Sequence, residues 1–100
     1  MEVLTKKEQD NLVIHLIGEL DEHAAPYVRT AMDDSLASNT FSGVIFDLER
    51  MSFMDSTGIG VLIGRYKKLK GKHATYVRNV SRTVDKIFTM SGLYSIMPKL

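Results

Sequence analysis

The chain has 100 residues, with 13 lysines and arginines, 12 acidic residues, no cysteine and a formal net charge of +1. This length suits a single domain, residues 1–100, that buries roughly two-thirds of its unfolded surface, and the nearly neutral charge gives no electrostatic drive toward nucleic acid or membrane. Without cysteine there is no disulfide framework or Cys-based metal site, and without a long apolar run or a signal-peptide core we expect a soluble, cytoplasmic protein.

Two short strand-like runs, Glu2–Lys6 and Leu12–Ile17, flank a polar turn and predict an antiparallel hairpin. His15 alternates with apolar residues in the second run, as a histidine on a partly open sheet face does. A ligand role is the weaker interpretation, because His23 and His73 show no metal-like spacing with it. We therefore expect no metal site.

A helix is expected after the second strand, because Pro26 is well placed in a first helical turn. Asp21 and Glu22 precede it, where acids are favourable with the helix dipole. Asp33 and Asp34 are predicted to be solvated surface rather than a carboxylate pair, since adjacent helix positions point in different directions. The buried face is predicted at Val28, Ala31, Met32, Ser35 and Leu36.

The stretch from Phe41 to Lys70 runs strand, polar loop and helix. Val44–Leu48 has the apolar character of a strand covered on both sides, and residues 49–54 are predicted to connect it onward. Side-chain oxygens at Asp55, Ser56 and Thr57 suit the free N–H groups of a first helical turn, so the helix should start near Ser56. Its sheet-facing residues are predicted to be Ile59, Leu62, Ile63, Tyr66 and Leu69.

Three glycines lie in this helix, at Gly58, Gly60 and Gly64. Each costs about 1 kcal/mol relative to alanine in a helix interior, so their presence needs a reason. One reason is a smooth surface that another backbone can approach closely.

The last third of the chain predicts one more strand and one more helix. The strand is Ala74–Val77, and the helix opens at Ser81 and ends at Gly92 in a left-handed cap. Ile96–Met97 is predicted as a short final strand. The order ββαβαβα indicates an α/β fold, a small mixed sheet that carries helices.

Polar residues follow two of the predicted strands. In α/β sheets, functional residues commonly lie beyond the C-terminal ends of the strands. Asp21 and Ser56 could therefore share one surface. The Ser56 hydroxyl allows three interpretations: a helix cap, a nucleophile, or an acceptor of phosphate from a partner kinase. The nucleophile lacks both the Gly-x-Ser-x-Gly pattern and a nearby histidine, but the residues alone do not choose between the other two.

Two other site types need patterns that this segment lacks. An aspartic protease motif is interrupted by Thr57 and followed by a helix rather than a strand. A nucleotide-binding loop would need Gly-x-x-x-x-Gly-Lys-[Ser/Thr], which this chain lacks. Neither pattern fits, and no cofactor is expected.

The segment from Met54 to Lys67, Met-Asp-Ser-Thr-Gly-Ile-Gly-Val-Leu-Ile-Gly-Arg-Tyr-Lys, resembles the phosphorylation site of the bacterial anti-anti-sigma factors. These are the STAS-domain proteins of the sporulation and general-stress partner-switching systems, and the sporulation type is the most similar. Gly18–Asp21 and Phe88–Leu93 agree in order and spacing. The resemblance covers essentially the whole chain and implies a STAS-domain fold.

This resemblance implies a regulator without catalysis of its own. Its unphosphorylated form would bind an anti-sigma factor that is also a serine kinase, with ATP bound by that partner, and so release a sigma factor. Phosphorylation of Ser56 would switch it off, and a PP2C-type serine phosphatase would restore it. The partner surface is expected to comprise Asp21, Asp55, Ser56, Thr57, Gly58, Ile59 and Gly60.

Two points stay open from the sequence. Ile59 is either an exposed apolar anchor for the partner or part of the core, because its helical phase allows both. The alternative function is a STAS interaction module that regulates a partner outside the sigma-factor systems.

Overall fold

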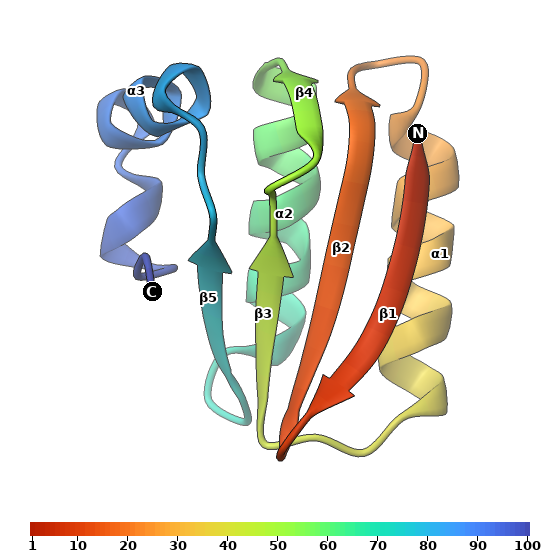
Figure 1. Cartoon of the computed structure of the whole chain (residues 1–100). Helices are drawn as coiled ribbons and strands as arrows, with labels where there is room; N and C mark the ends of the chain where they lie inside the picture. The colour runs from red at the N-terminus through yellow and green to blue at the C-terminus, as the bar shows by residue number, and fades with distance from the viewer.

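The computed structural model describes residues 1–100 and contains a five-stranded sheet and three α-helices (Figure 1). The α/β class predicted from the sequence is confirmed. The elements in chain order are β1 (Glu2–Glu8), β2 (Asn11–Leu20), α1 (Ala25–Ser38), β3 (Gly43–Asp47), β4 (Met51–Met54), α2 (Ser56–Leu69), β5 (Ala74–Arg78), α3 (Arg82–Ser91) and the 3-10 helix η1 (Leu93–Ser95).

The N-terminal hairpin is confirmed and is the only antiparallel part of the sheet. Glu8 pairs with Asn11 across a two-residue turn, in which Gln9 has a φ of 56°. The strands follow the order β1-β2-β3-β5, and β2–β3 and β3–β5 are parallel pairs. Parallel neighbours need crossover connections, which α1 and α2 provide.

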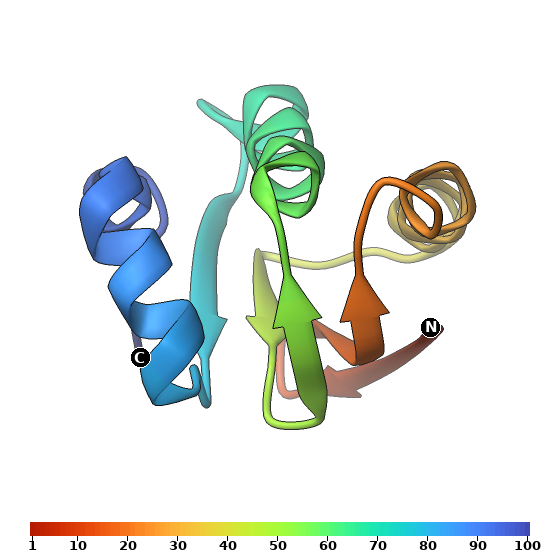
Figure 2. The ribbon, with the colours of Figure 1, turned by 90° about the horizontal axis from the view of Figure 1, so that it is seen from above.

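The helices leave one face of the sheet uncovered. Figure 2 shows α1 and α2 on one side of the strands and α3 beside β5, with no helix on the other side. Along β2 the side chains alternate accordingly: Leu12, Ile14 and Leu16 belong to the core cluster of 20 buried residues, whereas His15 points to the uncovered face. The prediction for His15 is therefore confirmed, with 27% of its side chain exposed.

Residues 49–54, after β3, were predicted to be a connection, but most of them form a strand. Residues Met51–Met54 form β4, a parallel partner of the end of β2 at Gly18–Leu20. The burial order along β4 is buried, exposed, exposed, buried. A strand of four residues without alternation carries no period-2 signal, and the element order is therefore ββαββαβα.

The buried face of α2 is turned by about one residue from its predicted position. Its buried residues are Gly58, Val61, Leu62, Arg65 and Leu69. Arg65 is a buried charged side chain whose Nε lies 3.1 Å from Asp33 Oδ1 on α1, whereas Ile59, Ile63 and Tyr66 are partly buried and pack against the core. Asp33 also pairs with Lys68 at 2.9 Å, and 36% of its side chain is exposed. The prediction of Asp33 as solvated surface is therefore only partly right, because one of its oxygens faces the buried Arg65.

The C-terminal residues bind the edge of β5. Gly92 has a φ of 76° and ends α3 as predicted, and the Ser81 side chain caps the start of α3. The prediction of a final strand at Ile96–Met97 was wrong, because the pairing with β5 occurs further along the chain, between Lys99 and Val77. None of the helices is long and apolar enough to cross a membrane.

Candidate functional site

The start of α2 confirms the predicted helix boundary and shows how Ser56 is presented. Asp55 is the N-cap, and its Oδ1 accepts a hydrogen bond from the Gly58 N–H at 3.0 Å. Because Asp55 performs the capping, the hydroxyl of Ser56 is not required for it. Ser56 is exposed as the first residue of the helix, and Thr57 is half-buried.

A second loop, between β2 and α1, contains Asp21. Its Oδ1 accepts from the Ala24 N–H at 2.9 Å, and its carbonyl oxygen accepts from the Ala25 N–H at 3.0 Å. Helix α1 has no other side-chain cap. Asp21 therefore fixes the start of α1, as expected for an acid at a helix N-terminus, and it remains only half-buried.

The two loops meet above the carboxyl ends of β2 and β4. The Asp55 N–H donates to the Leu20 carbonyl oxygen at 3.3 Å, which joins the strand ends. An open hollow of about 510 Å³ lies between the loops, lined by Asp21, Glu22, His23, Pro26 and Asp55. The sequence predicted that Asp21 would share a surface with the start of α2, and the structure brings Asp21 and Asp55 together, one residue before Ser56.

The glycines of α2 differ in what they do. A Cβ added at Gly58 would lie 2.6 Å from Met54 Cγ and 2.9 Å from the Leu20 carbonyl oxygen, whereas one added at Gly60 or Gly64 would meet nothing within 4 Å. Gly58 is thus buried and required inside the domain. Gly58 therefore exposes little surface, and its predicted role toward a partner stays a prediction. Gly60 is exposed, so its predicted role toward a partner stays a prediction.

Ile59 is neither a fully exposed anchor nor a fully buried core residue. It is half-buried and packs against the core cluster. Part of its side chain therefore stabilises the attachment of α2 to the sheet, and only the remainder could contact another protein.

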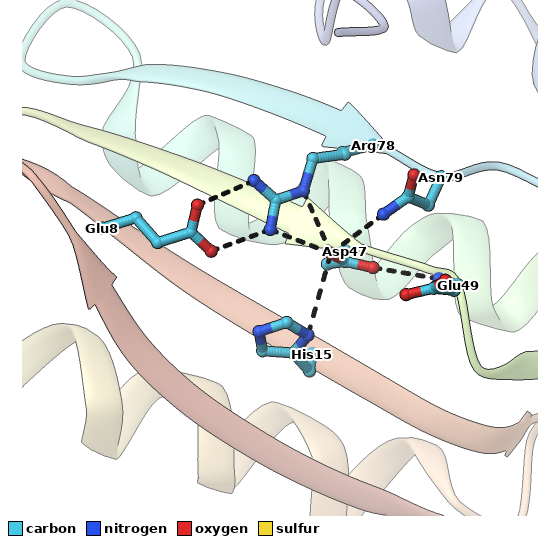
Figure 3. A network of polar contacts seen from close by, with 6 residues as sticks. All are labelled: Glu8, His15, Asp47, Glu49, Arg78 and Asn79. Carbon is cyan, nitrogen blue, oxygen red and sulfur yellow. Dashed lines mark hydrogen bonds and ion pairs between the residues drawn. The ribbon is translucent and has the colours of Figure 1, made fainter.

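A polar network on the helix-free face of the sheet was missed by sequence reasoning (Figure 3). Asp47, only 4% exposed, accepts from the Glu49 N–H at 3.0 Å, from Arg78 Nε at 3.0 Å and from Asn79 Nδ2 at 3.2 Å. The Arg78 guanidinium also makes two hydrogen bonds to Glu8, at 3.0 and 2.9 Å. The network thus joins β5, β3 and β1 across the sheet. Its members are far apart in sequence, so no local pattern indicates it.

The charges of this network shift each other's pKa values. Burial alone raises the pKa of Asp47, but the hydrogen bonds from Glu49, Arg78 and Asn79 outweigh it and hold the pKa below its usual range. The hydrogen bond with Glu8 raises the pKa of Arg78, and the same contact lowers the pKa of Glu8.

We predict that Arg78→Gln moves the acid-unfolding midpoint to higher pH. Because the pKa of Asp47 is lower in the folded state, its carboxylate stabilises the fold above the unfolded pKa of about 4, and this stabilisation is lost as pH falls through the folded pKa. Without Arg78 the folded pKa rises and the loss begins at higher pH. Circular dichroism against pH measures the midpoint. Arg29→Gln, at an exposed position on α1, is the control, and an equal shift in both variants would contradict the prediction.

Known proteins resemble this chain over nearly its whole length. The family model of the STAS domain matches residues 2–100. A curated anti-sigma F factor antagonist of Paenibacillus polymyxa is 39% identical over 87% of this chain and 75% of its own length. The anti-sigma F factor antagonist of Lysinibacillus sphaericus is 37% identical over 93% of this chain and 78% of its own length.

Solved structures agree with the fold and with these relatives. The anti-sigma factor antagonist SpoIIAA in its unphosphorylated form is 33% identical, with a TM-score of 0.79 over 99% of this chain and 88% of that chain. The phosphorylated form of the Bacillus cell fate determinant SpoIIAA, also 33% identical, has a TM-score of 0.72 over 99% of this chain and 91% of that chain. The chain is therefore similar to antagonists whose structures include both phosphorylation states.

Proposed function

This chain belongs to the STAS domain family, and from that premise we propose that it is an anti-sigma factor antagonist switched by phosphorylation of Ser56. The similarity to the sporulation-type proteins agrees with the predicted resemblance. In its unphosphorylated form, the domain binds an anti-sigma factor serine kinase in the cytoplasm and releases the sigma factor. The domain acts by binding and needs no catalysis of its own.

The observation that carries this proposal is the position of the Ser56 hydroxyl. Ser56 is exposed at the first residue of α2, and its neighbour Asp55 performs the capping. The hydroxyl is therefore free to accept the γ-phosphate of ATP held by the partner, with loss of its proton and release of ADP. A helix N-terminus also accommodates an anion, through its free N–H groups and the helix dipole. We expect little change of fold on phosphorylation.

The effect of the phosphate falls on the partner contact. Phosphate adds roughly −1.5 to −2 charges beside the carboxylates of Asp21 and Asp55, which line the same hollow. A surface that fits a hydroxyl would have to desolvate this charge, and burying an unpaired charge is costly. Binding is therefore lost, and a PP2C-type serine phosphatase restores it.

The direct test is phosphate transfer. After incubation with the anti-sigma factor of the source organism and ATP, mass spectrometry should find one phosphate on the wild type, at Ser56, and none on Ser56→Ala. Thr57→Val, which removes the neighbouring hydroxyl, should still gain one phosphate. Phosphate on Thr57, or full phosphate uptake by Ser56→Ala, would overturn the site assignment.

A further inference from the structure

Phe53 on β4 is one of the large apolar side chains that the fold leaves exposed. It is 48% exposed, and it is not among the partly buried apolar residues that pack against the core. Isolated exposed apolar residues are common on protein surfaces. The reason to single out Phe53 is how the backbone exposes it and where it lies.

A β-bulge turns Phe53 outward. Gly18 of β2 pairs with Met51, but the next residue, Glu19, pairs with Phe53, so Ser52 is an extra residue on β4. With regular alternation, Phe53 would share the inward side of Met51. The inserted residue gives the inward position to Met54 instead, which is 2% exposed. Bulges beside functional sites commonly re-aim side chains in this way.

Phe53 also lies close along the chain to the loop that presents Ser56. Phe53 stands three residues before Ser56, and its partner Glu19 stands two residues before Asp21. The pairing of Leu20 with Met54 follows directly, so both strands lead from this pair into the two loops of the site. A side chain on a paired strand has less freedom to lose on binding than one on a mobile loop.

We propose that Phe53 is an apolar anchor by which this domain binds its anti-sigma factor. This inference rests on the proposed function and extends the contact surface beyond the residues around Ser56. Aromatic side chains are enriched among the few residues that dominate binding energy, and a polar rim usually surrounds them. Here polar residues lie in the two loops that follow the paired strands, where Asp21, Glu22 and Asp55 line the hollow. Its carboxylates favour a partner whose apolar pocket for Phe53 is bordered by basic groups.

Phe53→Ala tests the inference. Isothermal titration with the anti-sigma factor of the source organism, without ATP so that no phosphate is transferred, should show binding weakened by about 30-fold, the size typical of a hot-spot residue. Phe53→Tyr, which keeps the ring, should bind within about threefold of the wild type by the same criterion. Met90→Ala is the matched control, because Met90 is 87% exposed on α3 and should have no effect.

The outcomes separate this inference from the proposed function. Thermal unfolding of Phe53→Ala should stay close to that of the wild type, because Phe53 is 48% exposed and lies outside the core cluster; a large loss of stability would itself contradict its role as a surface anchor. Wild-type binding with Phe53→Ala unchanged overturns the anchor alone. Absence of binding by the wild type, or full binding by Ser56→Asp, overturns the proposed function.

Discussion

Ser56→Asp is expected to weaken binding to the anti-sigma factor by more than about a hundredfold, equivalent to roughly 3 kcal/mol. The substitution places a permanent charge where the partner surface fits a hydroxyl, beside the carboxylates of Asp55 and Asp21. Like charges at close range repel, and burying the added carboxylate without a partner is costly. Titration calorimetry without ATP measures the change in Kd directly.

The fold of the Ser56→Asp variant should remain intact, so the loss can be assigned to the interface. Residue 56 is the first residue of α2, where an acidic side chain interacts favourably with the helix dipole, by about 0.3–1 kcal/mol. The melting temperature should therefore be equal to or slightly above that of the wild type. A clear fall in melting temperature would mean that the site does not tolerate an anion as proposed.

Two matched variants complete this test. Ser56→Ala removes the hydroxyl without adding charge and should still bind. Ser38→Asp adds the same charge at the exposed end of α1, which lies at the opposite end of the domain from the start of α2 (Figure 1), and should also bind. Retention of wild-type affinity by Ser56→Asp would remove the electrostatic basis of the switch.

The parts of the fold that were predicted correctly have local causes. Asp55 and Ser81 mark helix starts, and Gly92 marks a helix end, because capping depends on residues within one turn. The hairpin was visible because its turn is short and its strands are consecutive. The proximity of Asp21 to the start of α2 followed from a general rule, that loops at the carboxyl ends of neighbouring strands converge.

The parts that sequence reasoning missed depend on tertiary contacts. The strand β4 exists because it pairs with the end of β2, and its bulge at Ser52 removes the alternation that would reveal a strand. The buried face of α2 includes Arg65, which lies against Asp33, and arginine is expected at the surface unless its partner is known. Likewise, the close packing around Gly58 could not be predicted, because the Leu20 carbonyl that crowds it lies 38 positions earlier.

The distinction between the glycines leads to the second large effect. We expect Gly58→Ala to destabilise the domain by about 2 kcal/mol, within the range for overpacking a buried site. The added Cβ would lie 2.6 Å from Met54 Cγ, which can move, and 2.9 Å from the Leu20 carbonyl oxygen, which belongs to the backbone. That carbonyl also accepts the Asp55 N–H, so a shift would disturb the loop that presents Ser56. Differential scanning calorimetry should show a melting temperature lower by about 10 °C.

Gly60→Ala should change stability in the opposite direction, because its added Cβ meets nothing within 4 Å and alanine favours a helix by up to about 1 kcal/mol over glycine. A more stable Gly60→Ala domain that binds the anti-sigma factor less well would show that the glycine serves the partner contact at a cost to the isolated fold. A more stable variant with unchanged binding would remove Gly60 from the partner surface.

If Gly58→Ala were as stable as the wild type, the close packing of α2 on Leu20 would not constrain position 58.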